Sequence, residues 1–389
     1  MHKMLKYLLL LLPLFLTNCA SGIQNEKIEY IDQLISQEME KSNIPGMAIS
    51  VGKNGKQLFS KGYGFANISS NKPVTTDTTF HIASITKTIT ATAIVQLVEQ
   101  KKIALDTPIN RYLDFSVNNP HFPQENITVR QLLNHTSSIS DEKAYEIDFR
   151  VRGKDSEIEL EQLVKGYLQS NGEFYEYNKN YLQVKPGTTW SYSNIGYALL
   201  GYILEKVTDE DLRSFSEKHI FSPLQMDRSY WRIAETPIYN TATSYHLNED
   251  KLTEVQTVGF ADWPAGMIRS TASDVNSFAL VTANSNPKKK NKLLKHQSIL
   301  SMLAMATFDG LPPWNPGQGL GWGQSMLDGK PIISHWGGDP GVFTAVYIDP
   351  KTTAAVTILM NTSANKDTMS SLKTVAIALF DLMNTNKPM

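Results

Sequence analysis

A serine and a lysine three residues apart are the first pair in this sequence whose types and spacing could do chemistry. Ser84 and Lys87 stand in the stretch 80–87, FHIASITK. Residues three apart share one face of a helix, so the hydroxyl and the ammonium can approach each other. A lysine whose pKa is lowered can accept the serine proton, and the helix N-terminus supports a developing oxyanion. The pair therefore indicates a serine nucleophile.

The S-x-x-K spacing alone is a weak signal of a catalytic serine, so the predicted structure around each occurrence must distinguish the candidates. It occurs seven times, beginning at Ser50, Ser69, Ser84, Ser140, Ser285, Ser363 and Ser370. The pair that begins at Ser50 lies at a strand end, where residues three apart point to opposite faces. Only Ser84 opens a long apolar helix, predicted from Ala83 to Gln100. The structural alternative for Ser84 is a capping serine with a solvated lysine, but a lysine entering a mostly apolar helix favours a chemical role.

Two further motifs carry polar groups that could meet a substrate. Tyr192-Ser193-Asn194 is the only Y-x-N in the chain, and it precedes a predicted helix. It offers a phenol and a carboxamide from one turn. His335-Trp336-Gly337-Gly338 ends an apolar strand, where small residues let a substrate lie close to the sheet edge. Taken singly, each has a structural alternative, a tyrosine corner or a histidine on an edge strand.

Composition and missing motifs exclude several other classes of function. Lys and Arg total 37 against 38 Asp and Glu, without a basic stripe, so we expect no nucleic-acid partner. There is no H-E-x-x-H, no His/Asp cluster at metal-ligand spacing, no G-x-G-x-x-G after a strand, and no G-x-x-x-x-G-K-[ST]. We therefore expect no metal and no cofactor. The G-x-S-x-G elbow of α/β-hydrolases is also missing.

The N-terminal residues have the pattern of an export signal. Lys3 and Lys6 precede the apolar run Tyr7–Leu16, which is too short to span a bilayer and predicts a signal peptide over residues 1–18. The following Cys19 is the only cysteine, so the mature chain can form no internal disulfide and its nucleophile is not a cysteine.

The end of that signal, Leu16-Thr17-Asn18-Cys19, resembles the lipobox of bacterial lipoproteins, in which the cysteine becomes the lipid-modified first residue. Asn18 departs from the usual Gly, Ala or Ser. The alternative is an ordinary secretory signal, or a short anchor, with Cys19 incidental. We expect an exported cell-envelope protein, lipid-anchored to a membrane on its periplasmic or extracellular side.

Hydrophobic periodicity predicts strands near both ends of the chain and helices between them. The Asn54-Gly55 pair predicts a hairpin. The expected fold class is α/β (α+β), an antiparallel sheet flanked by N- and C-terminal helices with an inserted, mostly helical domain. The predicted units are 19–27 (lipidated Cys19 and tether), 28–83 with 311–389 (sheet domain) and 84–310 (inserted domain). The predicted strands are 47–51, 57–63, 331–336, 342–348 and 354–360; the predicted helices are 28–40, 83–100, 129–134, 158–169, 193–207, 273–281, 298–306 and 368–383.

The three motifs together, in this order, resemble the serine β-lactamase and penicillin-binding-protein superfamily in its class C type of arrangement. Supporting blocks run from about residue 28 to residue 360, and they comprise residues 132–137, 186–187, 196–197, 223–226, 265–267 and 319–323. The resemblance implies a β-lactamase/transpeptidase-like fold, with the active site in the cleft between the sheet and the helical domain.

The resemblance also implies a role for each motif residue. Ser84 matches the acylated nucleophile, and Lys87 matches the partner that helps to deprotonate it. Tyr192 matches the group proposed as base in acylation and as activator of water in deacylation. Asn194 matches a contact to the substrate amide and the lysine. His335 and Gly337 match the family's third motif, [KH]-x-G. The backbone N–H groups of Ser84 and Gly338 would then form the oxyanion hole.

Two departures from the family pattern affect these expectations. Ser138 stands where the family's block usually has glycine, which indicates a slightly altered loop, and His135 in that block is expected to organise the loop rather than to react. His335 replaces the lysine typical of class C β-lactamases. Its imidazole, with an ordinary pKa near 6.5, would be largely neutral at pH 7 and charged towards pH 6. A neutral group holds a substrate carboxylate weakly, which favours esterase or D-amino-acid peptidase activity over efficient β-lactamase activity.

The expected function is an exported serine hydrolase that acts through an acyl-enzyme on an ester, amide or β-lactam bond. Its partner is then a small-molecule or peptide substrate. The alternative is a non-catalytic penicillin- or peptidoglycan-binding sensor module of the same fold. The loops that shape the cleft have no sequence pattern common to the family, so the sequence does not identify the substrate. Tyr245 and Asp262-Trp263 are candidate residues of these loops.

Overall fold

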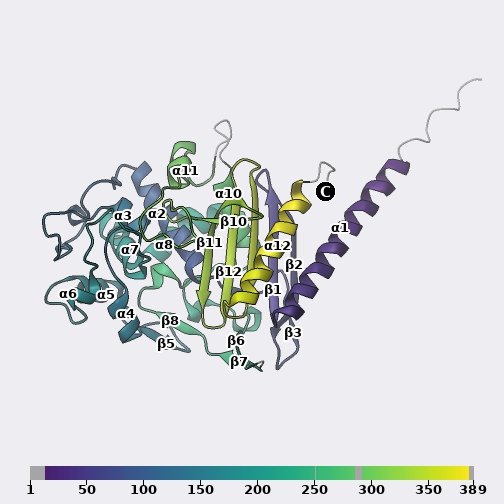
Figure 1. Cartoon of the computed structure of the whole chain (residues 1–389), viewed down its shortest axis with the longest axis horizontal. Coiled ribbons are helices and arrows are strands. Elements are labelled where there is room, and N and C mark those ends of the chain that lie inside the picture. Colours follow the sequence, from purple (N-terminus) through teal and green to yellow (C-terminus); the bar gives the residue numbers. More distant parts are fainter. Residues whose placement is uncertain (1–13, 250, 285–290, 385–389) are drawn as a thin grey trace, which may run out of the picture.

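A seven-stranded antiparallel sheet forms the centre of the protein (Figure 1). The computed structural model describes residues 14–249, 251–284 and 291–384. The strand order is β10-β11-β12-β13-β1-β2-β3, so strands from the two ends of the chain pair with each other, β13 with β1. The strands are β1 (Gly46–Lys53), β2 (Lys56–Asn67), β3 (Lys72–Pro73), β10 (Gly323–Leu327), β11 (Lys330–Asp339), β12 (Val342–Asp349) and β13 (Ala354–Met360). The predicted antiparallel sheet, built from both termini, is confirmed.

Helices cover both faces of this sheet, which explains why its central strands β1, β12 and β13 are buried along nearly their whole length. On one face, α1 (Leu14–Lys41) and α12 (Lys366–Asn384) contribute Ile35 and Leu379 to a core with Ile358 of β13. On the other face, α10 (Ala272–Ala283) contributes Phe278 to the larger core, which also holds Leu359 of β13. All seven residues of β13 are buried as a result.

The turn between β1 and β2 has the geometry that its sequence predicts. Asn54 and Gly55 have φ angles of 56° and 75°, in the left-handed region that asparagine and glycine tolerate. They connect Lys53 to Lys56, which are paired across the hairpin. The predicted hairpin is confirmed.

Most of the remaining elements form a mostly helical region beside the β11 side of the sheet, while β6 and β7 lie at one end of the sheet (Figure 1). The buried helix α2 lies within it, and twelve of its fourteen residues are buried. The helices are η1 (Ala83–Ile85), α2 (Thr86–Glu99), η2 (Ile109–Arg111), α3 (Val129–Leu133), α4 (Glu142–Ile147), α5 (Leu160–Leu168), α6 (Tyr177–Asn180), α7 (Asn194–Thr208), α8 (Leu212–Ser216), η3 (Glu217–Phe221), α9 (Ser222–Leu224), η4 (Ile233–Glu235), η5 (Ile238–Asn240), η6 (Trp263–Ala265) and α11 (His296–Met302). The short strands are β4 (Phe80–His81), β5 (Arg150–Arg152), β6 (Ser244–Asn248), β7 (Lys251–Val255), β8 (Val258–Phe260) and β9 (Arg269–Ser270).

The structure differs from the sequence-based expectations at several points. α1 begins at Leu14 rather than at residue 28, so the backbone of the predicted tether 19–27 is helical. The helix predicted from residue 83 begins as the 3-10 turn η1. Strands β5 to β9 interrupt the region predicted to hold few of them. Residues 1–13, which contain most of the predicted signal peptide, lie outside the described residues.

The predicted division into a sheet domain and an inserted domain remains a prediction, and one helix bears on it. α10 lies within the range 84–310, but it packs on β1, β12 and β13 of the sheet. Leu280 of α10 lies so close to Gly52 of β1 that a β-carbon at Gly52 would come within 2.6 Å of it. In the part of the chain that the structure describes, no helix combines the length and the apolar character that crossing a membrane needs.

Candidate active site

Ser84 lies in the turn η1, directly before α2. The residue before it, Ala83, has a φ angle of 46°, a conformation that is rare outside glycine and that recurs at functional sites. The neighbouring segment is fixed, because Ile82 donates its backbone N–H to Ile268 at 3.0 Å. The strained residue thus turns the chain between a fixed segment and the helix, and Ser84 lines a cavity at this point.

Lys87 lies one helical turn after Ser84, and its side chain is completely buried. Its Nζ donates to Ser84 Oγ at 3.3 Å, to Asn194 Oδ1 at 2.7 Å and to the Ala265 carbonyl at 2.7 Å. Burial lowers the pKa of Lys87 to about 7, although the charges of Asp262 and Asp141 oppose this shift. A large fraction of Lys87 is therefore the free amine near neutral pH, in contact with the serine hydroxyl.

Tyr192 lies against the same pair. Its ring centroid is 4.7 Å from Lys87 Nζ. Burial raises the pKa of the Tyr192 phenol well above its ordinary value, and a hydrogen bond with Ser84 offsets this only in part. The phenol is thus protonated at neutral pH, so it can relay a proton between neighbours but is not a standing phenolate base.

The loop behind Tyr192 holds it in place. The His135 ring stacks on the Tyr192 ring with centroids 4.4 Å apart, and its Nδ1 accepts the backbone N–H of Ser193 at 3.2 Å. His135 and Ser138 have φ angles of 61° and 64°. Ser138 thus adopts the conformation that glycine would favour, and Asn119 donates to its hydroxyl at 2.8 Å. His135 contacts the tyrosine rather than Ser84 in the contacts the structure records, as expected for an organising residue.

Asp141, which the sequence analysis did not identify, fixes the start of α7 and with it Asn194. Its carboxylate accepts from Ser193 Oγ at 2.8 Å, from the Asn194 N–H at 2.5 Å and from the Ile195 N–H at 3.2 Å. Burial raises its pKa to about 6 against these hydrogen bonds. The Asn194 side chain is thereby aimed at Lys87. No spacing signal connects Asp141 to residues 193–195, since the pairing depends on how two loops meet.

Strand β11 brings the third motif to the same place. β10 pairs with β11 only over Lys330–Ser334, so His335–Asp339 continue beyond it towards Ser84. A β-carbon at Gly337 would lie 2.2 Å from the Ile82 carbonyl, whereas one at Gly338 would meet nothing within 4 Å. Gly337 therefore permits the strand to approach the chain before Ser84, and Gly338 faces open space.

His335 stays neutral to a lower pH than its ordinary pKa of about 6.5 indicates. Its Nδ1 lies 2.8 Å from the Trp336 carbonyl, and burial, followed by the charge of Lys87, lowers the His335 pKa to about 3. The expectation that His335 would become charged towards pH 6 is therefore wrong. Its imidazole is neutral throughout the physiological range.

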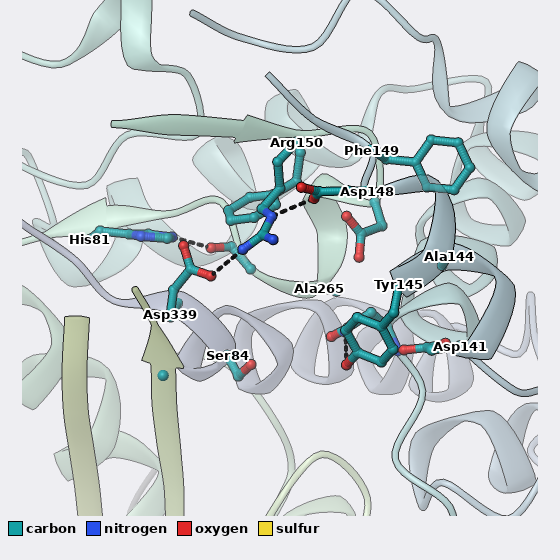
Figure 2. Close-up of a pocket in the computed structure, with 16 residues that line it drawn as sticks. His81, Ser84, Asp141, Ala144, Tyr145, Asp148, Phe149, Arg150, Ala265 and Asp339 are labelled. Carbon is teal, nitrogen blue, oxygen red and sulfur yellow. Dashed lines mark hydrogen bonds and ion pairs between the residues drawn. The ribbon is translucent and has the colours of Figure 1, made fainter. Parts of the chain in front are cut away.

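These residues surround one cavity of about 200 Å³, which we call the Ser84 cavity (Figure 2). Ser84, Asn194 and Gly338 line it, Lys87 and Tyr192 contact Ser84, and His335 and Gly337 lie beside Gly338 on β11. The other lining residues are His81, Ala83, Asp141, Ala144, Tyr145, Asp148, Phe149, Arg150, Phe260, Asp262, Ala265, Gly266 and Asp339. The structure thus brings the three motifs together.

The cavity wall also contains charged residues that sequence analysis missed. Arg150 on β5 pairs with Asp148 at 2.5 Å and, across the cavity, with Asp339 of β11 at 3.6 Å (Figure 2). Of the three candidate loop residues, Asp262 lines the cavity, whereas Trp263 is buried and is not among the lining residues. Tyr245 does not line it either: it is buried, and its hydroxyl accepts the Ile68 N–H at 2.8 Å.

The structure does not test two further predictions, the lipidation of Cys19 and the absence of a bound metal. Cys19 lies in α1, where its side chain is outside the described part of the chain, so its lipidation remains a prediction. Within residues 14–249, 251–284 and 291–384, no group of three or more His, Cys, Asp or Glu side chains could hold a metal ion.

Comparison with known proteins identifies the family. The family model described as Beta-lactamase matches residues 31–379. Protein flp of Staphylococcus aureus (strain MW2) is 25% identical over 341 residues, which cover 87% of this chain and 64% of that protein. The chain thus spans somewhat less than two thirds of the length of that relative. Penicillin-binding protein 4* of Bacillus subtilis (strain 168) is 26% identical over 354 residues, covering 85% of this chain and 71% of that protein.

A solved structure shares the fold. The D-amino acid amidase of Ochrobactrum anthropi SV3 superposes with a TM-score of 0.72 at 23% identity, covering 92% of this chain and 99% of that one. The β-lactamase/transpeptidase-like fold that the motifs implied is therefore confirmed.

The neighbouring glycines of β11 give a matched pair of variants. We expect Gly337→Ala to lower the free energy of unfolding by about 1–3 kcal/mol, because its β-carbon would overlap the Ile82 carbonyl and Thr344 Oγ1. Gly338→Ala serves as the control, and its stability should stay within about 0.5 kcal/mol of the wild type. Urea unfolding followed by circular dichroism measures both. Equal stabilities would show that β11 does not depend on the close approach at Gly337.

Proposed function

Because the chain belongs to the Beta-lactamase family, whose members include serine hydrolases, we propose that it hydrolyses ester or amide bonds through an acyl-enzyme formed on Ser84. The observation that carries the proposal is the contact of the buried Lys87 amine with the Ser84 hydroxyl. A serine hydroxyl is a poor nucleophile until a neighbouring base takes its proton. Lys87, with a pKa of about 7, is matched to that task at neutral pH.

The proposed first step is attack of Ser84 Oγ on the carbonyl carbon while its proton passes to Lys87 Nζ. The negative charge that develops on the carbonyl oxygen would be held by the backbone N–H groups of Ser84 and Gly338, both of which line the cavity. Collapse of this intermediate breaks the bond to the leaving group, which takes up the proton through Tyr192.

In the proposed second step, water attacks the acyl-enzyme and gives its proton to the same Tyr192 and Lys87 pair. The acid is released and Ser84 recovers its proton. Because the Tyr192 phenol stays protonated at neutral pH, its role is to relay the proton, and Lys87 is the group that changes charge.

The preferred bond is an ester or amide without a neighbouring carboxylate, rather than a β-lactam. The neutral imidazole of His335 offers a substrate carboxylate no positive charge. The fold neighbour named above is an amidase, which supports amide chemistry on this scaffold. The rival function, a sensor module that is acylated without turnover, requires the second step to fail.

We further propose that the protein is exported and anchored in the cell envelope through a lipidated Cys19. The support is the N-terminal pattern alone: Lys3 and Lys6, the apolar run 7–16 and the lipobox-like Leu16–Cys19.

Ser84→Ala should abolish both covalent labelling by a fluorophosphonate probe and the hydrolysis of p-nitrophenyl acetate. Lys87→Met and Tyr192→Phe should each lose roughly a hundredfold or more in kcat/KM, the scale of general acid–base catalysis, and their losses should not add. The matched control is Ser370→Ala, the exposed serine of another S-x-x-K spacing. Hydrolysis that survives in Ser84→Ala would place the nucleophile elsewhere, and labelling without turnover would favour the sensor module.

The ratio of kcat/KM for nitrocefin to that for p-nitrophenyl acetate tests the part assigned to His335. We expect the wild type to prefer the acetate, and His335→Lys to raise the ratio about ten- to a hundredfold, since a charge-assisted hydrogen bond is worth about 1.5–3 kcal/mol. His335→Gln, which is neutral, is the control. Because the His335 pKa is about 3, any change of this ratio between pH 6 and pH 8 comes from other groups and should be the same in the wild type and in His335→Gln. A rise towards pH 6 that His335→Gln abolishes would contradict the low pKa of His335. A ratio unchanged in the lysine variant would remove His335 from substrate selection.

Expression in a bacterial host tests the anchor. The full chain should fractionate with membranes and start at a lipid-modified Cys19. Cys19→Ser has no thiol to carry the acyl chains on which stable attachment depends, so it should be released into the soluble fraction. Mass spectrometry of the N-terminal peptide identifies the cleavage site. A mature chain that begins at another residue would contradict the lipoprotein assignment.

A further inference from the structure

The Ser84 cavity carries more negative than positive charge. Four carboxylates line it, those of Asp141, Asp148, Asp262 and Asp339, together with the guanidinium of Arg150. The ammonium form of Lys87 adds a positive charge only in part, because its pKa is about 7. A substrate carboxylate entering this cavity would meet repulsion, and a substrate cation would meet attraction.

Three of the four carboxylates already have partners in the protein. Asp148 and Asp339 share Arg150, at 2.5 Å and 3.6 Å. Asp141 accepts three hydrogen bonds at the start of α7. These three groups hold the loop 141–152 and α7 in position, so each of their carboxylates already has a donor within the fold.

The carboxylate of Asp262 is different. Within the described part of the chain, no other residue donates a hydrogen bond to it, although it is partly buried in the cavity wall. Its position is fixed relative to the catalytic pair: the Asp262 carbonyl accepts the Ala265 N–H at 2.9 Å, and the Ala265 carbonyl accepts Lys87 Nζ at 2.7 Å. One short turn, η6, thus connects this carboxylate to the lysine.

A partly buried carboxylate without a donor is unfavourable, and a charge-assisted hydrogen bond from an ammonium would relieve it. We propose that Asp262 binds a protonated amine on the acyl part of the substrate, so that the preferred substrates are esters or amides of amino acids, or peptides with a free N-terminus. This inference rests on the proposed acyl-enzyme at Ser84. A cavity of about 200 Å³ accommodates a small aminoacyl group, while the exposed Gly338 leaves the leaving group a path to solvent.

The bound ammonium would also act on the catalytic pair. A positive charge beside Lys87 disfavours the charged form of the lysine, which keeps more of it as the free amine during attack. An aminoacyl substrate would therefore support the state of Lys87 that the first step needs, whereas a carboxylate in the same position would oppose it.

The test compares two substrates that differ in the amine alone, alanine p-nitroanilide and propionic acid p-nitroanilide. Both enantiomers of the alanine compound are assayed and the faster is used. In the wild type, the alanine compound should have the higher kcat/KM, and Asp262→Asn should reduce the ratio of the two values by about ten- to a hundredfold. Effects of the substitution on Lys87 itself act on both substrates and cancel in the ratio.

Two further variants make the result specific. Asp262→Glu retains the charge and should restore most of the preference. Asp148→Asn removes a carboxylate that already pairs with Arg150, and its ratio should stay within about twofold of the wild type. Thermal unfolding of each variant confirms that it is folded.

The outcomes separate this inference from the proposed function. If the wild type labels with a fluorophosphonate at Ser84 and hydrolyses the propionyl compound, but Asp262→Asn leaves the ratio unchanged, the role of Asp262 is overturned and the hydrolase stands. A wild type that prefers the propionyl compound has the same consequence. If neither labelling nor hydrolysis occurs, both proposals fail together.

Discussion

The burial of one lysine amine is the constraint on which the rest of the site depends. Lys87 has no exposed surface, so every hydrogen bond that water would supply must come from the protein. Ser84, Asn194 and the Ala265 carbonyl provide these bonds from three separate segments of the chain. The same burial lowers the Lys87 pKa to about 7. Positioning of the three segments and activation of the serine are therefore consequences of one interaction.

The surrounding fold can be understood as the means of holding those three segments. Asp141 fixes Asn194 through the start of α7, and the turn η6 fixes the Ala265 carbonyl. On the other side, Gly337 lets β11 approach the segment before Ser84 closely. Strain at Ala83 and the positive φ of Ser138 are maintained because packed elements on both sides leave the backbone no alternative.

Sequence reasoning found the parts of this site that local patterns encode. The i, i+3 spacing of Ser84 and Lys87, the Y-x-N turn and the strand-end glycines are each contained within a few residues, and the structure brings them together around one cavity. The hairpin at Asn54-Gly55 and the strand-rich chain ends were predicted for the same reason. Asp141, Arg150 and Asp339 were missed, because their partners lie on loops that meet only in the folded chain. β10 lacks the β-branched residues that mark a strand, and β5 and β8 are three residues long, so their pairing rather than their composition defines them.

The central claim is that about half of Lys87 exists as a free amine at neutral pH. It can be measured directly by NMR of protein that carries 13C at the lysine ε-carbons, with the Lys87 signal assigned by its absence in Lys87→Met. The account predicts that this signal titrates with a midpoint of about 7, several pH units below the other lysines. A midpoint near 10.5, the ordinary value for lysine, would contradict it, because a permanently charged Lys87 could not take the proton of Ser84.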